Sequence, residues 1–477
     1  MLLRRLTNPH LGRSAYLVGC PKAGEAVLVD PERDMDRYLA AAAESAVRIT
    51  AVAETHLHCE FLSGALEVAQ WLDTPIYLSG EGRKIESYSW SNDPSYDIRP
   101  LLDGDTFRVG DIELQAISTP SHTPEHLCYL VTDRGADADQ PRGLLTGDFL
   151  QVGGLGEPDP CVDWETLEDG PRSPLNALLQ SLRALLLLPD FVQIWPGRCR
   201  VTNSEDLEGG LAVSTIGYER RFNEDLRRAS DNPEAYNRTV QAEMSKAAPY
   251  YARMKRDNRL GPAVLGRLPK PRLLTPRELQ DLAGRVDTAV IDTRTDRRRF
   301  MEGHLAGSLY APLDQHFSTV AGSYVEEGQP IYLILPEDRL EQAVRALVRI
   351  GLDSVIAYAP PEMLERLQNL RRTRVLDFRR ALQGSKRPEV QVLDVRAPGE
   401  FEDRHLPGAH NIAHTDLVNR RQELDRNKEL VVHCESGSRA ATASAFLERF
   451  GHRISFVDDL FDTLPLELST TRSESLV

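Results

Sequence analysis

The feature that most constrains the fold is an internal repeat in the C-terminal half of the chain, whose pattern returns after about one hundred residues. Residues 290–294 read Val-Ile-Asp-Thr-Arg and residues 392–396 read Val-Leu-Asp-Val-Arg. In each copy an apolar strand precedes a helix that ends near a glycine, Gly351 in the first and Gly451 in the second. A strand, a loop and a helix repeated in this order predict two small α/β domains with parallel sheets.

The two copies differ in the loop that joins this strand to its helix. In the second copy Cys434 follows the strand, and Gly437 and Arg439 come shortly after it. A cysteine there lies among backbone N–H groups beside a helix N-terminus, whose dipoles favour the thiolate over the thiol. Gly437 lets the loop curl, and Arg439 adds positive charge that can hold an anionic substrate. The sequence therefore predicts a nucleophilic thiol at Cys434 with Arg439 as its anion-binding partner.

This loop resembles the active loop of the rhodanese (sulfurtransferase) family, and residues 394–396 and 405–409 resemble the upstream signatures of that family. By this resemblance Cys434 carries a sulfane sulfur as a persulfide, while Asp394 braces the loop. The first copy has Ile334 near the position of Cys434, so that no thiolate can form there. We therefore expect the first copy to be a rhodanese-like domain without catalysis.

The N-terminal half carries two histidines, His56 and His58, after an apolar run at 49–53 that predicts a buried strand. A strand end can aim both imidazoles at one metal ion. The segment resembles the His-x-His-x-Asp-His motif of the metallo-β-lactamase fold, in which the Asp-His pair serves a second metal. Here that pair reads Glu60-Phe61, and phenylalanine cannot ligate a metal. We expect one metal or none.

The same resemblance supplies two further ligand candidates, His122 in a loop and Asp148 at a strand end. Arg198 stands where most members have a histidine, and arginine has no lone pair for a metal. The losses at Phe61 and Arg198 both affect the second metal position, and we hypothesise that Arg198 and Glu60 form an ion pair in the vacant space. The ligand set expected for the first metal is His56, His58, His122 and Asp148.

Two histidines and one carboxylate with open positions are typical of non-haem Fe(II) oxygenases. This set resembles that of persulfide dioxygenases, a mononuclear-iron branch of the fold, at His56, His122 and Asp148. Nearly the whole chain is similar, because some bacterial members carry two rhodanese domains after the dioxygenase, the first without its cysteine. The resemblance implies one Fe(II) per chain, with O₂ and a glutathione-like persulfide as substrates and sulfite as product. Cys434 would then pass sulfur to sulfite to give thiosulfate, or run the reverse.

Three departures from the family pattern leave alternatives open: glutamates at 60 and 157 replace aspartate and arginine, and Arg198 replaces histidine. One alternative is a sulfurtransferase whose N-terminal domain is a metal-free scaffold. Another is a zinc-dependent thioester hydrolase of the glyoxalase type, which relies on the second metal. His58 has an alternative role in hydrogen bonding to substrate or water, and His126 has one as a brace for its loop. The identity of the bound metal separates the three functions: iron for the dioxygenase, no metal for the sulfurtransferase and zinc for the thioester hydrolase.

Length and composition agree with a multidomain enzyme, since 477 residues predict about three domains. We place a metallo-β-lactamase-like αββα sandwich at 1–262, the cysteine-free rhodanese-like domain at 270–372 and the Cys434 domain at 373–477, with a linker rich in proline and glycine at 262–271. A net charge of −15 argues against nucleic acid or an anionic membrane as partner. Six cysteines without paired spacing, and no apolar run of membrane-spanning length, favour a reduced cytoplasmic setting. The oligomeric state, including a homo-oligomer, stays open.

Overall fold

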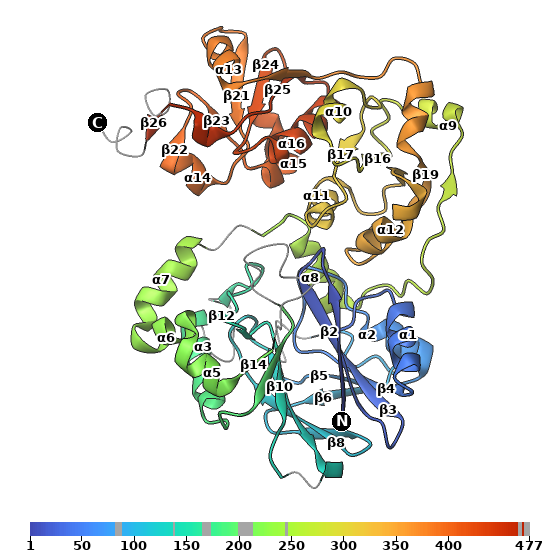
Figure 1. The fold of residues 1–477 in the computed structure, drawn as a ribbon, viewed down its shortest axis with the longest axis vertical. Helices are drawn as coiled ribbons and strands as arrows, with labels where there is room; N and C mark the ends of the chain where they lie inside the picture. The colour runs from blue at the N-terminus through green and yellow to red at the C-terminus, as the bar shows by residue number, and fades with distance from the viewer. Residues whose placement is uncertain are drawn as a thin grey trace. The chain divides into compact units, whose positions relative to one another are not determined.

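The structure is a computed structural model that describes residues 1–81, 88–136, 139–164, 173–198, 213–243, 247–465 and 470–471 (Figure 1). The chain forms two compact units, one of Met1–Arg267 with Val348–Gly351 and one of Leu268–Leu347 with Leu352–Val477. Among the helices of the described residues, none is long and apolar enough to cross a membrane.

The first unit is built on two six-stranded sheets. The strands of one sheet, in spatial order, are β1 (Leu2–Asn8), β2 (Arg13–Cys20), β3 (Glu25–Val29), β4 (Arg48–Ala53), β5 (Ile76–Ser79) and β6 (Ile98–Leu101). Those of the other are β14 (Ser214–Thr215), β13 (Gln193–Pro196), β10 (Gly143–Gly147), β9 (Leu127–Asp133), β8 (Ile112–Ser118) and β7 (Thr106–Val109). The short hairpin of β11 (Leu150–Gln151) and β12 (Gly154–Leu155) follows β10.

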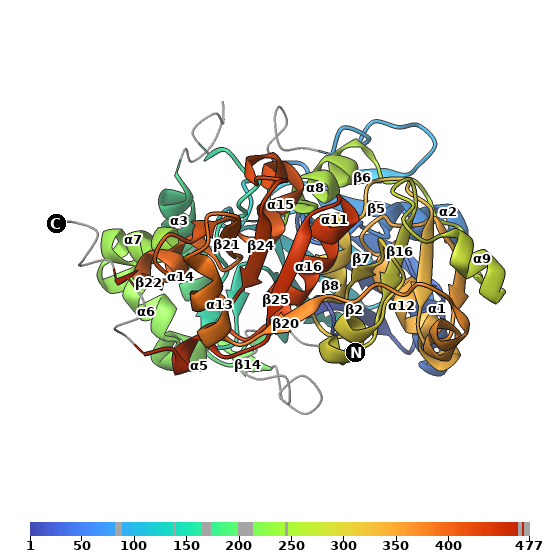
Figure 2. The same cartoon turned by 90° about the horizontal axis from the view of Figure 1, so that it is seen from above.

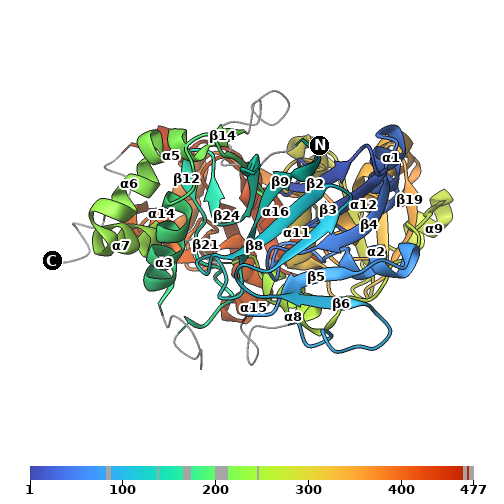
Figure 3. The ribbon, with the colours of Figure 1, turned by 90° about the horizontal axis from the view of Figure 1, so that it is seen from below.

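Helices cover the outer face of each sheet in the first unit, as Figure 3 shows. On the first sheet lie α1 (Asp36–Glu44) and α2 (Ala65–Leu72), and beside the second lie α3 (Pro174–Leu186), α5 (Ile216–Phe222), α6 (Glu224–Asp231) and α7 (Pro233–Glu243). The helix α8 (Tyr251–Leu260) follows α7 in the sequence. Buried side chains fill the space between the sheets, among them Val18, Val29, Leu114, Leu145 and Trp195. Since each sheet buries apolar side chains on both faces, the layers form the predicted αββα sandwich.

Strand ends and loops of this sandwich position the predicted metal ligands. His56 and His58 come directly after β4, and β4 runs parallel to both of its neighbours, as a buried strand of a βαβ unit does. Asp148 comes directly after β10, and His122 lies in the loop between β8 and β9. Gly147 has φ +49°, and a side chain there would collide with His126 and Thr55, so that only glycine lets β10 turn into Asp148 at this point.

The second unit contains two five-stranded sheets that share one strand order, in which every pairing is parallel. The first comprises β15 (Arg272–Leu273), β19 (Val355–Ala359), β18 (Ile331–Ile334), β16 (Ala289–Asp292) and β17 (Leu309–Tyr310). The second comprises β20 (Arg374–Leu376), β25 (Arg453–Val457), β24 (Glu429–His433), β21 (Val390–Asp394) and β23 (His410–Asn411). The internal repeat therefore marks two copies of one α/β fold, as the sequence predicts.

Among the described residues, each copy carries four α-helices around its sheet. In the first these are α9 (Pro276–Asp281), α10 (Arg297–Glu302), α11 (Phe317–Tyr324) and α12 (Leu340–Val348). In the second they are α13 (Phe378–Ser385), α14 (Pro398–Asp403), α15 (Leu417–Arg420) and α16 (Ser438–Arg449). Figure 2 shows α13 and α16 on opposite sides of the strands β21, β24 and β25. A short pairing of β22 (Arg404–His405) with β26 (Thr470–Thr471) adds to the second copy.

The strand register corrects one detail of the sequence comparison between the copies. Asp292 pairs with Ile334 in the first copy, and Asp394 pairs with His433 in the second. Ile334 is therefore the counterpart of His433, and the counterpart of Cys434 is Leu335, one residue further along than we expected. Leu335 is fully buried and has no thiol, so the conclusion that this copy lacks a nucleophile at the loop is unchanged.

Candidate metal centre and thiol loop

Three of the four predicted metal ligands lie together in the first unit. The ligand atoms of His56, His122 and Asp148 are all within 4.8 Å of one another, and the three side chains are buried. The Oδ2 atom of Asp148 is 3.9 Å from Nε2 of His56 and 3.5 Å from Nε2 of His122. Ligands that each approach an ion to about 2.1 Å are separated from one another by such distances.

Hydrogen bonds on the far side of each imidazole fix which nitrogen faces the group. The hydroxyl of Thr55 donates to Asp30, so its oxygen is left to accept a hydrogen bond from Nδ1 of His56 at 2.9 Å. Nδ1 of His122 lies 2.6 Å from the backbone carbonyl of Glu157, which can only accept. In the neutral form each ring therefore carries its proton on Nδ1 and presents the lone pair of Nε2 to the centre, as metal-bound histidines do.

The donor set fits a metal ion. Nε2 of His56 and Nε2 of His122 are buried and have no hydrogen-bond partner among the described residues, a state that costs free energy unless a ligand is bound. Burial, reinforced by the neighbouring histidines, lowers the pKa of His56 well below its ordinary value, so that this ring stays neutral and able to ligate. Two imidazoles and one carboxylate suit iron or zinc.

The structure places the fourth predicted ligand, His58, in a different group. Its Nε2 is 3.1 Å from Oε2 of Glu54 and 3.4 Å from Oδ1 of Asp30, and all three side chains are buried. Burial opposes the charge, but the hydrogen bonds and charges of Asp30 and Glu54 raise the pKa of His58 to about 10. The structure thus places His58 in an ion-paired group with Glu54 and Asp30, apart from the group of His56, His122 and Asp148. The side chains of His58, Glu54 and Asp30 could themselves hold a metal.

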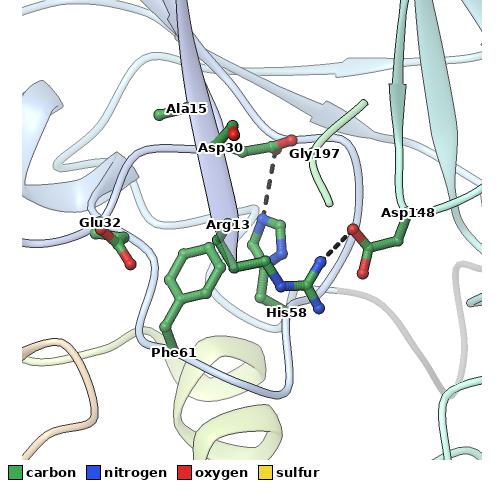
Figure 4. Close-up of a pocket in the computed structure, with 9 residues that line it drawn as sticks. Arg13, Ala15, Asp30, Glu32, His58, Phe61, Asp148 and Gly197 are labelled. Carbon is green, nitrogen blue, oxygen red and sulfur yellow. Dashed lines mark hydrogen bonds and ion pairs between the residues drawn. The ribbon is translucent and has the colours of Figure 1, made fainter. Parts of the chain in front are cut away.

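The cation beside the centre is Arg13, which the sequence did not single out. Arg13 begins β2 and forms an isolated antiparallel β-bridge with Arg198. The next residue, Ser14, donates its backbone N–H to the carbonyl of Gly197 at 2.9 Å. Its guanidinium donates to Oδ1 of Asp148 through one nitrogen and to Oε1 of Glu60 through the other. Figure 4 shows the side chain reaching Asp148 between Phe61 and His58. Asp148 thus gives Oδ1 to the arginine and keeps Oδ2 on the histidine side.

The expected ion pair of Arg198 with Glu60 is present, and Arg13 joins it by pairing with both Glu60 and Asp148. Arg198 lies 3.9 Å from Glu60 with its side chain half exposed, whereas Arg13 is 4% exposed. The cavity bounded by Arg13, His58, Phe61 and Asp148 has a volume of only about 10 Å³, which is room for at most one water molecule. Burial opposes charge on both groups, yet the ion pair raises the pKa of Arg13 and lowers that of Asp148, so both stay ionised.

Two other residues near the centre have supporting roles. Nε2 of His126 accepts a hydrogen bond from Asp148 N at 3.2 Å, and its Nδ1 lies 2.9 Å from the hydroxyl of Thr119. Burial lowers the pKa of His126 to about 3, and the neutral ring braces the turn that carries Asp148. Glu157 contacts His122 through its backbone carbonyl, while the residue itself is exposed at the surface. The reversed charge at 157 therefore lies away from the ligands.

The thiol loop of the second unit follows β24. Sγ of Cys434 accepts hydrogen bonds from the backbone N–H groups of Gly437 at 3.2 Å and Ala440 at 3.4 Å. Gly437 has φ +95° and is the N-cap of α16, so the sulfur lies at the N-terminus of a helix of 12 residues. The donors and the helix dipole both favour negative charge on the sulfur.

The charged residues around this loop are paired within the chain. Arg439 donates to both carboxylate oxygens of Glu400, at 2.6 and 2.7 Å, and this partner in α14 was not expected from the sequence. Its side chain is 30% exposed and still presents a cationic edge to an anion. Asp394 accepts from Arg396, whose Nη1 reaches Glu435 in the loop at 3.3 Å, an arrangement in keeping with the bracing role expected of Asp394.

Comparison with known proteins agrees with this architecture. The profile of the metallo-beta-lactamase superfamily matches residues 9–198, and that of the rhodanese-like domain matches residues 377–461. The crystal structure of a metallo-beta-lactamase from Staphylococcus aureus subsp. aureus COL is 31% identical with a TM-score of 0.65, and the match covers 76% of this chain and 99% of that one. The chain therefore belongs to the metallo-beta-lactamase superfamily, and it carries a rhodanese-like domain in its C-terminal part.

Curated relatives match less than half of the chain at lower identity. A hydroxyacylglutathione hydrolase from Nitrosococcus oceani is 29% identical over 206 residues, which are 43% of this chain and 69% of the relative. An uncharacterized protein from Aquifex aeolicus is 28% identical over 234 residues, 47% of this chain and 96% of that protein.

Proposed function

We propose that the chain oxidises a low-molecular-weight thiol persulfide to sulfite at a single non-haem iron and transfers sulfane sulfur through Cys434. The observation that carries this proposal is the buried group of two histidines and one carboxylate, in which Arg13 pairs with the carboxylate. His56, His122 and Asp148 form a group with two histidines and one carboxylate, and Arg13 fills the position in which a second metal would bind. This ligand set with open positions is the one that non-haem Fe(II) oxygenases use.

The proposed oxidation balances as one persulfide, one O₂ and one water giving one thiol, one sulfite and two protons. The outer sulfur loses four electrons, and O₂ gains them. Iron(II), when bound, supplies this electron chemistry. The chain's residues hold the geometry: Thr55 and the Glu157 carbonyl fix the rings of His56 and His122, and Arg13 keeps Asp148 ionised and oriented.

A second cavity of the first unit suits an anionic thiol as substrate. It has a volume of about 440 Å³ and is lined by Cys161, Lys255, Arg256 and Arg259 among others. Lys255 pairs with the buried Asp159 at 2.7 Å, and Asp159 N donates to the carbonyl of His122 at 2.8 Å, so this wall adjoins the loop of a ligand. A small thiol with carboxylates, of the glutathione kind, has the charge and size for such a site.

At Cys434 the proposed reaction is a sulfur exchange. The thiolate attacks the outer sulfur of a persulfide, the S–S bond of the donor breaks, and the thiol leaves with a proton. The resulting Cys434 persulfide then gives its outer sulfur to sulfite, which yields thiosulfate and restores the thiolate. The N–H groups of Gly437 and Ala440 stabilise the anionic sulfur in both states. Because the first reaction makes the sulfite that the second consumes, fusion of the two activities raises its local concentration.

The test is product analysis with glutathione persulfide under air. We expect one sulfite for each O₂ consumed, and thiosulfate in place of sulfite when persulfide is in excess. Uptake of O₂ that yields neither sulfite nor thiosulfate would contradict the proposal. Hydrolysis of a glutathione thioester by protein that contains zinc would instead favour a thioester hydrolase, the activity named for the Nitrosococcus oceani relative. Sulfur transfer through Cys434 without O₂ uptake would indicate that the first unit is a scaffold without catalytic activity.

A further inference from the structure

We propose that the cysteine-free copy contributes to sulfur transfer, because its Arg297 is a positioning residue for the Cys434 loop. Both copies belong to the second unit. Arg297 begins α10 in the first copy, and its guanidinium donates to the backbone carbonyl of Ser436 in the loop of the second copy at 2.9 Å. The inference deepens the function proposed for Cys434.

The contact acts on one peptide unit. The carbonyl of Ser436 and the N–H of Gly437 belong to the same planar trans peptide, and they point in opposite directions. Arg297 holds the carbonyl on one side, while on the other side the N–H donates to Sγ of Cys434 at 3.2 Å. The positive charge both fixes the plane of this peptide and polarises it, which strengthens its hydrogen bond to the anionic sulfur.

The arginine itself is held in place by the second copy. Asp458, whose side chain is 1% exposed, accepts from Nε of Arg297 at 2.7 Å and also from Arg298. A Cβ atom on Gly437 would lie 2.9 Å from Oδ1 of Asp458 and 3.1 Å from Nε of Arg297. The loop, the carboxylate and the arginine are therefore packed closely, and glycine is required at 437 for this reason as well as for its φ of +95°.

Further contacts within the second unit keep the two copies together. Glu448 of α16 lies 3.1 Å from Nε2 of His304 and accepts from Arg371. Arg449 donates to three backbone carbonyls of the first copy, at Val286, Thr288 and Gly307. Figure 2 shows α11 beside α16, where the rings of Tyr324 and Phe446 pack against each other at a tilt and the Tyr324 hydroxyl donates to the carbonyl of His414. These contacts hold α10 against the loop, so Arg297 is part of a fixed arrangement.

The neighbouring arginine supplies a matched control. Arg298 shares the partner Asp458 with Arg297, but only Arg297 donates to the loop carbonyl. The experiment compares Arg297→Ala, Arg297→Lys and Arg298→Ala in the full chain. The first readout is the rate of Cys434 alkylation by iodoacetamide, followed by mass spectrometry of the peptide that contains Cys434. This readout needs no assumption about the reaction that Cys434 catalyses.

We expect Arg297→Ala to alkylate roughly tenfold more slowly, because the thiolate loses a well-oriented donor. Arg298→Ala should stay within about twofold of the wild type, and Arg297→Lys should recover part of the rate, since an ammonium can also bind the carbonyl. In sulfur transfer from thiosulfate, Arg297→Ala should lower kcat and leave KM within about twofold, because the peptide N–H acts on the sulfur and not on substrate capture.

Two results would overturn the inference: a wild-type alkylation rate in Arg297→Ala, or equal slowing in Arg297→Ala and Arg298→Ala. Melting temperatures of all variants are measured alongside. If Arg297→Ala unfolds, Arg297→Gln, which keeps the size and removes the charge, replaces it with the same expectation. A chain that shows the alkylation pattern without any sulfur transfer would contradict the proposed function while supporting the role of Arg297.

Discussion

The metal centre and the thiol loop differ in whether the chain supplies hydrogen bonds to their reactive atoms. Nε2 of His56 and Nε2 of His122 are buried without a hydrogen-bond partner among the described residues. Sγ of Cys434 is also buried, and it accepts hydrogen bonds from the backbone N–H groups of Gly437 and Ala440. The first site is incomplete until a ligand binds it, whereas the second is complete from the chain alone. We infer that the first activity depends on the metal and that the second persists without it.

The two sites also use arginine differently. At the metal centre Arg13 binds the carboxylates of Asp148 and Glu60, and it takes the position that a second cation would need. At the thiol loop Arg297 binds a peptide carbonyl and acts on the sulfur through the peptide. A guanidinium can thus either bind carboxylates or orient a peptide donor, depending on whether its partner is a side chain or a backbone group.

The largest expected effect that separates the sites is that of Cys434→Ser. It should abolish sulfur transfer from thiosulfate to cyanide, because serine at this loop cannot form a persulfide. Metal content and persulfide-dependent O₂ uptake should remain at the wild-type level. Both activities are measured on one preparation. A parallel loss of O₂ uptake would show that the sites are not independent.

His122→Ala should have the converse effect. With one imidazole lost, metal affinity should fall by at least about 100-fold, and O₂ uptake should disappear with it. Transfer through Cys434 should be unchanged. Glu157→Ala is the matched control. Residue 157 contacts His122 only through its backbone carbonyl, so this variant should keep its metal. Metal bound to each variant is measured after dialysis; full retention in His122→Ala would remove His122 from the ligand set.

The role of Arg13 is tested by metal stoichiometry. Phe61→His restores a ligand type at the second position, but Arg13 still occupies the space, so this variant should bind one Zn²⁺ per chain. The double variant Arg13→Ala with Phe61→His should bind two, since Glu60 and Asp148 become free for the second ion. Isothermal titration of the metal-free protein distinguishes the cases. Two ions in Phe61→His alone would show that the arginine does not exclude a metal.

The smallest expected effect concerns acid stability at the thiol loop. Burial lowers the pKa of His433, which precedes Cys434, to about 4, below about 6.5 in the unfolded chain. The unfolded state therefore binds more protons between these values, and stability is lost as the pH falls from about 6.5 to 4 by on the order of 3 kcal/mol. His433→Leu, which keeps packing against Phe461, should flatten that part of the profile. Urea unfolding at pH 7 and 4.5 measures it; an unchanged loss in the variant would refute the assignment.

Much of the fold followed from the sequence because its signals are local and periodic. The repeated strand patterns at β16 and β21 specify two parallel α/β sheets, and the apolar run before His56 specifies a buried strand. The ligands His122 and Asp148 follow from their places in a known family pattern, and the structure brings them within reach of His56.

The parts that sequence reasoning missed depend on where side chains point in three dimensions. Arg13 is one of 57 lysines and arginines, and nothing in its neighbours distinguishes it from a surface residue. The available signal was indirect, because Glu60 and Asp148 without a second metal require some other cation. Likewise, His58 lies against Glu54 and Asp30, a contact that its spacing from His56 does not indicate. Such pairings between distant residues cannot be read from spacing.

We predict that the first unit holds one iron and acts through it. The most direct measurement is the metal content of the wild-type chain purified without oxygen, followed by O₂ uptake on glutathione persulfide with the same sample. We predict about one iron per chain and uptake in proportion to the iron. Two zinc ions per chain, or a metal-free chain with active transfer through Cys434, would contradict the account.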